Sequence, residues 1–202
     1  MSTEMKSLSL LLSCVLALII FPIASIAQDA DEDALRIDRN HSTIGFTVPI
    51  AGGISKVTGK FTDFTVDIVW DDNDPSNSSV SVEIQVASVS TGYEGRDGDV
   101  TSEGILDAET YPTITFESHD IRRNGTGFVA VGDFTLHGVT KEIYLPINVA
   151  TVTDPGNPDD PLRAFQISYR LNRSDYGIDW KHRSIDFFFG FDIDIDIAIL
   201  LR

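Results

Sequence analysis

Hydrophobic and polar residues alternate with a period of two along most of the chain after about residue 42. Successive side chains of a strand point to opposite faces of a sheet, so this alternation predicts strands that each have one apolar face. No long stretch shows the 3.6-residue periodicity of an amphipathic helix. The alternation predicts strands around residues 42–48, 64–70, 80–86, 114–116, 128–136, 143–149, 165–171 and 185–199.

These eight expected strands are mostly joined by short turns, among them Asn124-Gly125, a strong hairpin signal. One longer excursion runs from about Ser88 to Tyr111, between the third and fourth strands, and its acidic and small residues predict an irregular or short helical segment. Eight antiparallel strands with one apolar face each favour an all-β fold, an eight-stranded up-and-down barrel. Closure of the sheet leaves no edge strand with unpaired backbone groups. A two-sheet sandwich is the competing architecture. A barrel of this size is either filled by side chains or wide enough for one small ligand, and alternation is compatible with both.

Alternation also leaves open whether the apolar face points inward or toward lipid, as it does in an outer-membrane barrel. The runs 56–70 and 185–201 are longer than the ~10 residues of a membrane strand. Asp192, Asp194 and Asp196 occupy the polar positions of the last run, and facing water they need no partner. Alternate residues of a strand stand ~7 Å apart, too far for one ion to take all three carboxylates. We therefore expect the apolar side chains to face the interior and these aspartates to lie on the solvent-exposed outer face.

The first 27 residues predict a signal peptide. Lys6 supplies the positive charge of a short n-region, residues 8–21 form an apolar h-region, and Ser25-Ile26-Ala27 is a small-x-small cleavage site. The expected mature protein is one domain, residues 28–202, of a secreted or periplasmic protein. The single cysteine, Cys14, falls in the signal segment, so the mature domain depends on its core for stability.

The chain is strongly acidic, with 15 Lys and Arg against 31 Asp and Glu and a formal net charge of −16. Neutralising nucleic-acid phosphates needs clustered basic side chains, so this charge argues against a nucleic-acid partner. It argues equally against docking on anionic lipid surfaces, and we expect no stable membrane insertion. The oligomeric state is open, a homodimer included.

Nothing in the sequence indicates catalysis. The four histidines, at positions 41, 119, 137 and 182, lack the spacing of a metal site, and no G-x-S-x-G motif is present. We expect no catalytic residue, no metal and no cofactor. Arg96-Asp97 lies in the long excursion of a chain poor in arginine, and is either a structural ion pair or a polar clamp at a barrel mouth.

Several short motifs recur in a fixed order over residues 35–200. They are Asp38-x-x-His41-Ser42-x-Ile44-x-Phe46, Ser55-x-Val57-x-Gly59-x-Phe61, Ser90-Thr91-Gly92, Arg96-Asp97, Tyr111-Pro112-x-Ile114-x-Phe116-x-Ser118, Gly132-x-Phe134-Thr135-Leu136-His137-Gly138-Val139-Thr140-Lys141 and Asn172-Arg173-Ser174-Asp175-Tyr176-Gly177. Each motif is weak alone, but the ordered set resembles the YceI-like family of periplasmic polyisoprenoid-binding proteins. In one departure, that family commonly reads R-D-x-H-L where this chain has Arg96-Asp97-Gly98-Asp99-Val100.

The resemblance implies a lipocalin-like barrel with an apolar tunnel for a polyisoprenoid, an isoprenoid quinone, a fatty amide or another long-chain lipid, held without catalysis. The alternative is a secreted structural or stress-response barrel with a filled core, and a hydrolase ranks below both. The expected polar contacts at the mouth are His41, Arg96 and Asp97. The expected apolar wall is Phe46, Phe64, Phe116, Phe128, Phe134, Phe165, Phe187, Phe189, Phe191 and Ile193.

Overall fold

The computed structural model describes residues 37–154, 157–185 and 188–201. The predicted signal peptide lies outside the described residues. Residues Leu35–Arg202 form a compact unit. Its strands are β1 (Thr43–Ile50), β2 (Ser55–Phe61), β3 (Phe64–Val69), β4 (Ser79–Gln85), β5 (Val89–Ser90), β6 (Thr113–Asn124), β7 (Gly127–Leu136), β8 (Val139–Asp154), β9 (Asn157–Asn172) and β10 (Asp192–Leu201). Its helical segments are α1 (Glu94–Thr101), η1 (Ala51–Gly53), η2 (Pro75–Asn77), η3 (Val86–Ser88) and η4 (Arg173–Tyr176).

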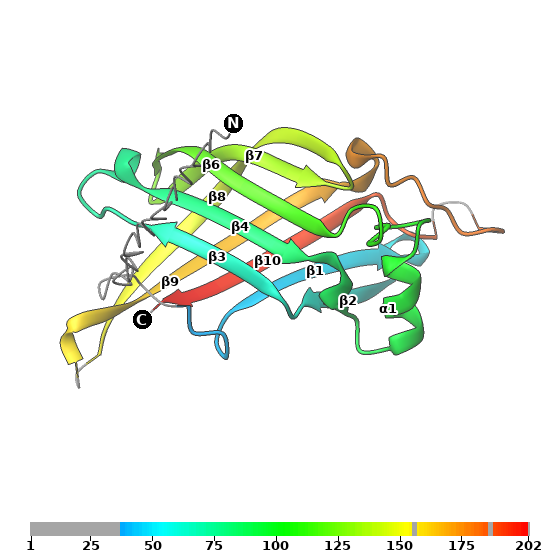
Figure 1. The fold of residues 1–202 in the computed structure, drawn as a ribbon, viewed down its shortest axis with the longest axis horizontal. Helices are drawn as coiled ribbons and strands as arrows, with labels where there is room; N and C mark the ends of the chain where they lie inside the picture. The colour runs from blue at the N-terminus through cyan, green and yellow to red at the C-terminus, as the bar shows by residue number, and fades with distance from the viewer. Residues whose placement is uncertain (1–36, 155–156, 186–187, 202) are drawn as a thin grey trace, which may run out of the picture. The chain divides into compact units, whose positions relative to one another are not determined.

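All ten strands belong to one sheet, in the order β3-β4-β6-β7-β8-β9-β10-β1-β2-β5. Each neighbouring pair is antiparallel. The sheet curls around a common interior, and α1 lies at the end where the β1–β2 turn also lies (Figure 1). The all-β, up-and-down, barrel-like architecture is confirmed, as is a short helix in the excursion before Tyr111. Within the described residues no helix is long and apolar enough to cross a membrane.

The expected number of strands was wrong: the structure has ten, not eight. The run 56–70 is divided into β2 and β3 by a turn at Thr62-Asp63. Phe61 and Phe64 are both buried. In one continuous strand, two residues three positions apart would lie on opposite faces. The turn reverses the parity so that both rings face inward. The other additional strand is β5, two residues that pair with Lys60 and Phe61.

The last strand is also shorter than expected: β10 begins at Asp192, and the described residues 178–185 and 188–190 lie outside the named strands. Its three aspartates lie opposite polar residues of β9. Asp192 accepts a hydrogen bond from Asn172 (3.0 Å), Asp194 from Arg170 (2.7 Å), and Asp196 from Ser168 (3.1 Å). The carboxylates are therefore a cross-strand polar row on the outer face. Among the described residues, no group of three or more His, Cys, Asp or Glu is arranged to hold a metal ion.

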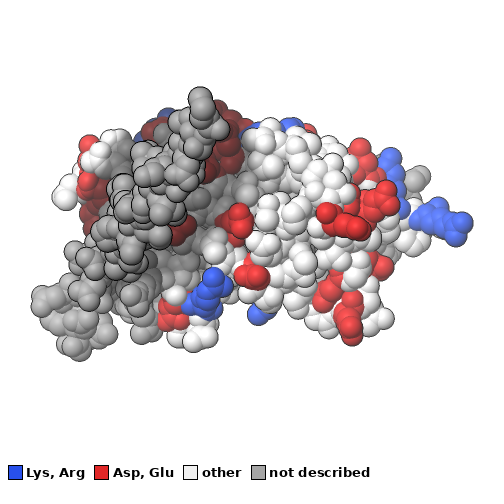
Figure 2. All heavy atoms as spheres, in the orientation of Figure 1, with Lys and Arg blue, Asp and Glu red and all other residues white. Residues whose placement is uncertain are grey.

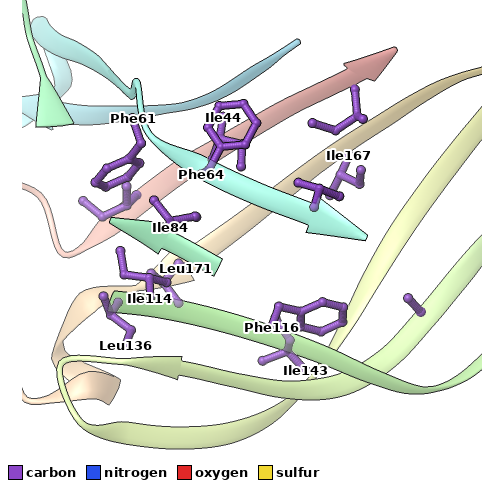
Figure 3. Packing of buried hydrophobic residues seen from close by; sticks show 14 of the residues in the cluster. Ile44, Phe61, Phe64, Ile84, Ile114, Phe116, Leu136, Ile143, Ile167 and Leu171 are labelled. Carbon is purple, nitrogen blue, oxygen red and sulfur yellow. The ribbon is translucent and has the colours of Figure 1, made fainter. Parts of the chain in front are cut away.

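The apolar parity of the strands faces the interior, where it forms one continuous hydrophobic cluster. Figure 3 shows Ile44, Phe61 and Phe64 beside Ile84 and Ile114 in this cluster. This arrangement is opposite to that of an outer-membrane barrel, whose apolar side chains point outward. The interior of the curled sheet is therefore the place to look for a site.

Gly132 is required by the close approach of β7 to β6. A Cβ at this position would lie 2.2 Å from the carbonyl oxygen of Glu117, beside the irregularity between Ser118 and Asp120. We expect Gly132→Ala to lower the free energy of unfolding by about 1–3 kcal/mol, because backbone cannot move aside as a side chain can. Urea unfolding followed by circular dichroism measures the effect.

Gly98 is the matched control, because a Cβ there meets nothing within 4 Å and the residue lies in α1. Gly98→Ala is expected to be neutral or to stabilise by up to about 1 kcal/mol, since alanine is the better helix former. Equal losses in the two variants would contradict the explanation.

Candidate functional site

The curled sheet encloses a cavity of about 310 Å³. Side chains of nine strands line the cavity, and among the described strands only the two-residue β5 contributes none. Six of these strands contribute Phe46, Val82, Phe116, Leu145, Tyr169 and Ile195. The volume lies in the usual range of ligand pockets, roughly 300–1,000 Å³.

The polar groups of the lining are few. Arg96 and Asp99 come from α1 and Arg173 from η4, elements that lie at the same end of the curled sheet in Figure 1. The indole of Trp180 closes part of this end and lies 3.4 Å from the position that a Cβ on Gly104 would occupy. We call this end, where α1, Ile178, Trp180 and Phe189 meet the cavity, the mouth.

Arg173 is a buried cation that holds the mouth together. Its Nε donates a hydrogen bond to the Gly190 carbonyl (3.0 Å), one terminal nitrogen donates to the Ile178 carbonyl, and the other donates to the Trp180 carbonyl (2.9 Å). The guanidinium carbon lies 4.6 Å from the centroid of the Phe191 ring, a cation–π distance. Burial lowers the pKa of Arg173, and nearby Asp179 opposes this shift.

Tyr176, also from η4, is buried beneath the same segment. Its ring meets the Phe134 ring edge-on, with centroids 5.5 Å apart. Burial raises the pKa of Tyr176 to about 12, and the charges of Tyr169 and Asp175 add to the increase. The phenol thus stays neutral in the folded protein at pH values where an unfolded tyrosine, with a pKa near 10, ionises.

This difference predicts an alkaline loss of stability. The contribution of Tyr176 is fully present below pH ~10 and is lost as the pH rises toward ~12, because the unfolded state then releases its proton first. The loss is about 3 kcal/mol for a pKa raised from 10.0 to about 12. Urea unfolding at increasing pH should show Tyr176→Phe losing less stability than the wild type. Tyr93→Phe, at an exposed position, is the control, and it should follow the wild type.

Six members of the predicted apolar wall lie in the lining of the cavity: Phe46, Phe116, Phe134, Phe165, Phe189 and Ile193. The other described members lie elsewhere. Phe64 is buried in the core, Phe128 packs edge-on against Trp70 (4.8 Å), and Phe191 stacks on Arg173. Phe187 lies outside the described residues.

The three predicted polar contacts are separated in the structure. Arg96 lines the cavity. Asp97 turns away and accepts hydrogen bonds from the Thr91 amide (2.7 Å) and hydroxyl (2.6 Å), which hold the loop before α1. His41 is exposed beside Asp38 (2.9 Å). It precedes β1, whose first residue pairs with Ala198 near the end of β10, away from the mouth.

Sequence reasoning missed Asp99, Tyr169, Arg173 and Trp180, which also line the cavity. Asp99 stands where the family pattern commonly has a histidine. Arg173 lies within a motif that was recognised, but its role depends on carbonyl groups that only folding brings together. Most of the wall is Ile, Val and Leu, whose inward parity the alternation does predict.

The fold and the site define an antiparallel, barrel-like protein with an apolar internal cavity. The YceI-like domain family matches residues 35–201, and the chain belongs to this family. It is 33% identical to a UPF0312 protein of Serratia proteamaculans over 149 residues, 71% of this chain and 74% of that protein. It is 32% identical to a UPF0312 protein of Yersinia pestis over 139 residues, 68% and 69% of the two chains.

Solved structures show the same fold. Burkholderia cenocepacia BcnA superposes with a TM-score of 0.71 at 20% identity, over 82% of this chain and 99% of that one. The Campylobacter jejuni YceI protein gives 0.64 at 23% identity, over 74% and 86%. A domain from Saccharophagus degradans, described as polyisoprenoid-binding, gives 0.60 at 16% identity, over 84% and 98%.

Proposed function

We propose that this protein is a non-catalytic carrier, exported from the cytoplasm, that holds one amphiphilic chain-like lipid in its cavity. The ligand class is a polyisoprenoid, an isoprenoid quinone or a fatty amide. The observation that carries the proposal is the apolar cavity of about 310 Å³, whose few charged groups lie at the mouth. Such a cavity suits a ligand with a long apolar tail and one polar end. The Saccharophagus degradans domain, described as polyisoprenoid-binding, supports the same ligand class.

The energetics favour an occupied cavity. Apolar cavities stay dry, and in one engineered series the cost rose by ~24 cal/mol per Å³ of void. A lipid tail would restore the missing contacts, which favours the carrier over a barrel with a filled core.

The lining also supports a binding role over hydrolysis. Among the described residues that line the cavity there is no serine, cysteine or histidine. Nucleophilic catalysis commonly depends on such a side chain beside a base. Arg96 and Asp99 are suited to orienting a polar head group instead.

Extraction of the purified protein with organic solvent, followed by mass spectrometry, tests the proposal. We expect a chain-like lipid to be recovered. In addition, a polyprenol, an isoprenoid quinone or a fatty amide should raise the melting temperature by about 5–10 °C at a hundredfold excess over Kd. Recovery of no lipid, together with an unchanged melting temperature for all three ligands, would contradict the carrier and favour a filled structural barrel.

A further inference from the structure

The mouth carries an exposed face that cavity binding does not explain. Ile54 at the β1–β2 turn is 92% exposed, Ile185 is 49% exposed, and Trp180 is 37% exposed. Burial of such exposed apolar side chains against a partner is favourable, because it removes their surface from water. Exposed apolar patches therefore mark interaction sites. We call these three residues, together with the basic residues Lys56, Lys181 and Arg183, the docking face.

Backbone pairing joins the parts of this face. The Ala51 amide donates a hydrogen bond to the Phe188 carbonyl (2.7 Å), and the Gly190 amide donates to the Pro49 carbonyl (2.8 Å). Ile50 and Phe189 form an isolated antiparallel bridge. The β1–β2 turn and the segment before β10 therefore lie side by side at one end of the sheet (Figure 1).

The charge of the docking face differs from that of the rest of the chain. Lys56, Lys181 and Arg183 are exposed, and none forms an ion pair within the described part of the chain. Asp179 and Asp186 are the acidic residues of positions 50–56 and 178–190, so the charge of these stretches of sequence is three minus two, +1, in a chain of −16. Figure 2 shows basic side chains at the tip on the right. Acidic residues of α1 border this end. Because they repel anions, only the basic tip is suited to contact an anionic surface.

The docking face adjoins the way into the cavity. Trp180 and Phe189 line both the large cavity and a second hollow of about 240 Å³, whose other walls include Lys181, His182 and Phe188. Aromatic and basic side chains together are typical of protein surfaces at the membrane–water interface, where rings enter the head-group region and cations meet lipid phosphates.

We propose that the docking face binds the surface of a phospholipid bilayer that contains anionic lipid. Ile54, Trp180 and Ile185 enter the interfacial region, while Lys56, Lys181 and Arg183 contact phosphates. The net charge of −16 repels other orientations, so the protein docks with its mouth toward the lipid. This inference rests on the proposed function for its purpose, the exchange of a lipid at the mouth, but docking itself is measured separately.

The two tryptophans of the chain provide a direct test. Trp180 lies in the docking face, whereas Trp70 follows β3 and packs against Phe128 and Phe165. The test uses the compact unit of residues 35–202, which contains every strand and the whole described core. In Trp70→Phe protein, vesicles of phosphatidylcholine and phosphatidylglycerol should shift the Trp180 emission to the blue, and brominated lipids should quench it. In Trp180→Phe protein, Trp70 should show neither effect.

Paired variants separate the apolar and charged contributions. Ile54→Ser/Ile185→Ser should weaken vesicle binding about 100-fold. Lys181→Glu/Arg183→Glu should weaken it about 10-fold on vesicles with phosphatidylglycerol, and less on phosphatidylcholine alone. Val69→Ser/Val152→Ser is the matched control, because these residues are 62% and 52% exposed. Val69 is the last residue of β3 and Val152 lies near the end of β8, and both strands end on the side of the sheet away from α1 (Figure 1). This control should bind as the parent does.

An absent Trp180 response, or equal losses in the control and the Ile54→Ser/Ile185→Ser variant, would overturn the docking proposal. Ligand-induced melting shifts distinguish this result from failure of the carrier. A protein that takes up detergent-solubilised lipid but does not bind vesicles retains the carrier function without docking. A protein that binds vesicles but yields no lipid and shows no melting shift retains docking without the carrier function.

Discussion

Replacement of Arg173 by methionine is expected to lower the free energy of unfolding by about 3–5 kcal/mol. Methionine fills similar space but donates no hydrogen bond, so the carbonyls of Ile178, Gly190 and Trp180 all lose their donor. Replacing both partners of a buried polar contact can be neutral, but here the backbone carbonyls remain. Urea unfolding gives the stability change, and the melting temperature should fall by about 10 °C.

Arg173→Lys is the informative companion variant. It keeps the positive charge, but one ammonium group cannot reproduce the planar set of donors that meets three carbonyls in different directions. We expect an intermediate loss, with faster amide hydrogen exchange in residues 178–190 in both variants. If Arg173→Lys is as stable as the wild type, charge rather than guanidinium geometry maintains the mouth.

Filling the cavity is expected to weaken lipid binding several hundredfold while leaving the protein folded. Val82 on β4 and Leu145 on β8 both line the cavity. Phenylalanine at both positions would exclude part of the lipid tail. Each excluded methylene costs ~0.8 kcal/mol, so losing four or five weakens binding by several hundredfold. Mass spectrometry of extracted lipid and ligand-induced melting shifts measure the loss.

The stability of the unliganded variant separates blocked binding from misfolding. The new rings occupy space that would otherwise be void, so the double variant should unfold at a urea concentration close to that of the ligand-free parent. Val152→Phe adds the same ring at an exposed position and should keep full lipid binding. Undiminished lipid recovery from the Val82→Phe/Leu145→Phe variant would show that the lipid binds elsewhere.

The strand pattern could be predicted because side-chain parity is a local property. Val66 and Ile68 alternate with polar neighbours, and burial in the folded protein follows that alternation. The division of 56–70 into β2 and β3 was missed, although Phe61 and Phe64 change parity within the run. That change was a usable local signal for the turn at Thr62-Asp63.

The site was less predictable, because the same apolar residue types line the cavity and pack the solid core. Phe116 and Phe64 share the inward parity, yet Phe116 lines the cavity and Phe64 packs in the core beside it. The adjacent Arg96 and Asp97 face different surroundings because successive helical residues point in different directions. Such distinctions depend on how strands and helices meet.

The all-β class, the inward apolar parity, the short helix before Tyr111 and, through the ordered motifs, the family could all be predicted from the sequence. These follow from local alternation and from residues read in order. The cavity in the interior, the hydrogen bonds from Arg173 to the Ile178, Trp180 and Gly190 carbonyls, and the pairing of the β1–β2 turn with the segment before β10 became visible in the folded protein. The physical reason is that voids, buried donors and exposed faces arise from contacts between segments far apart in the chain, which local periodicity does not record.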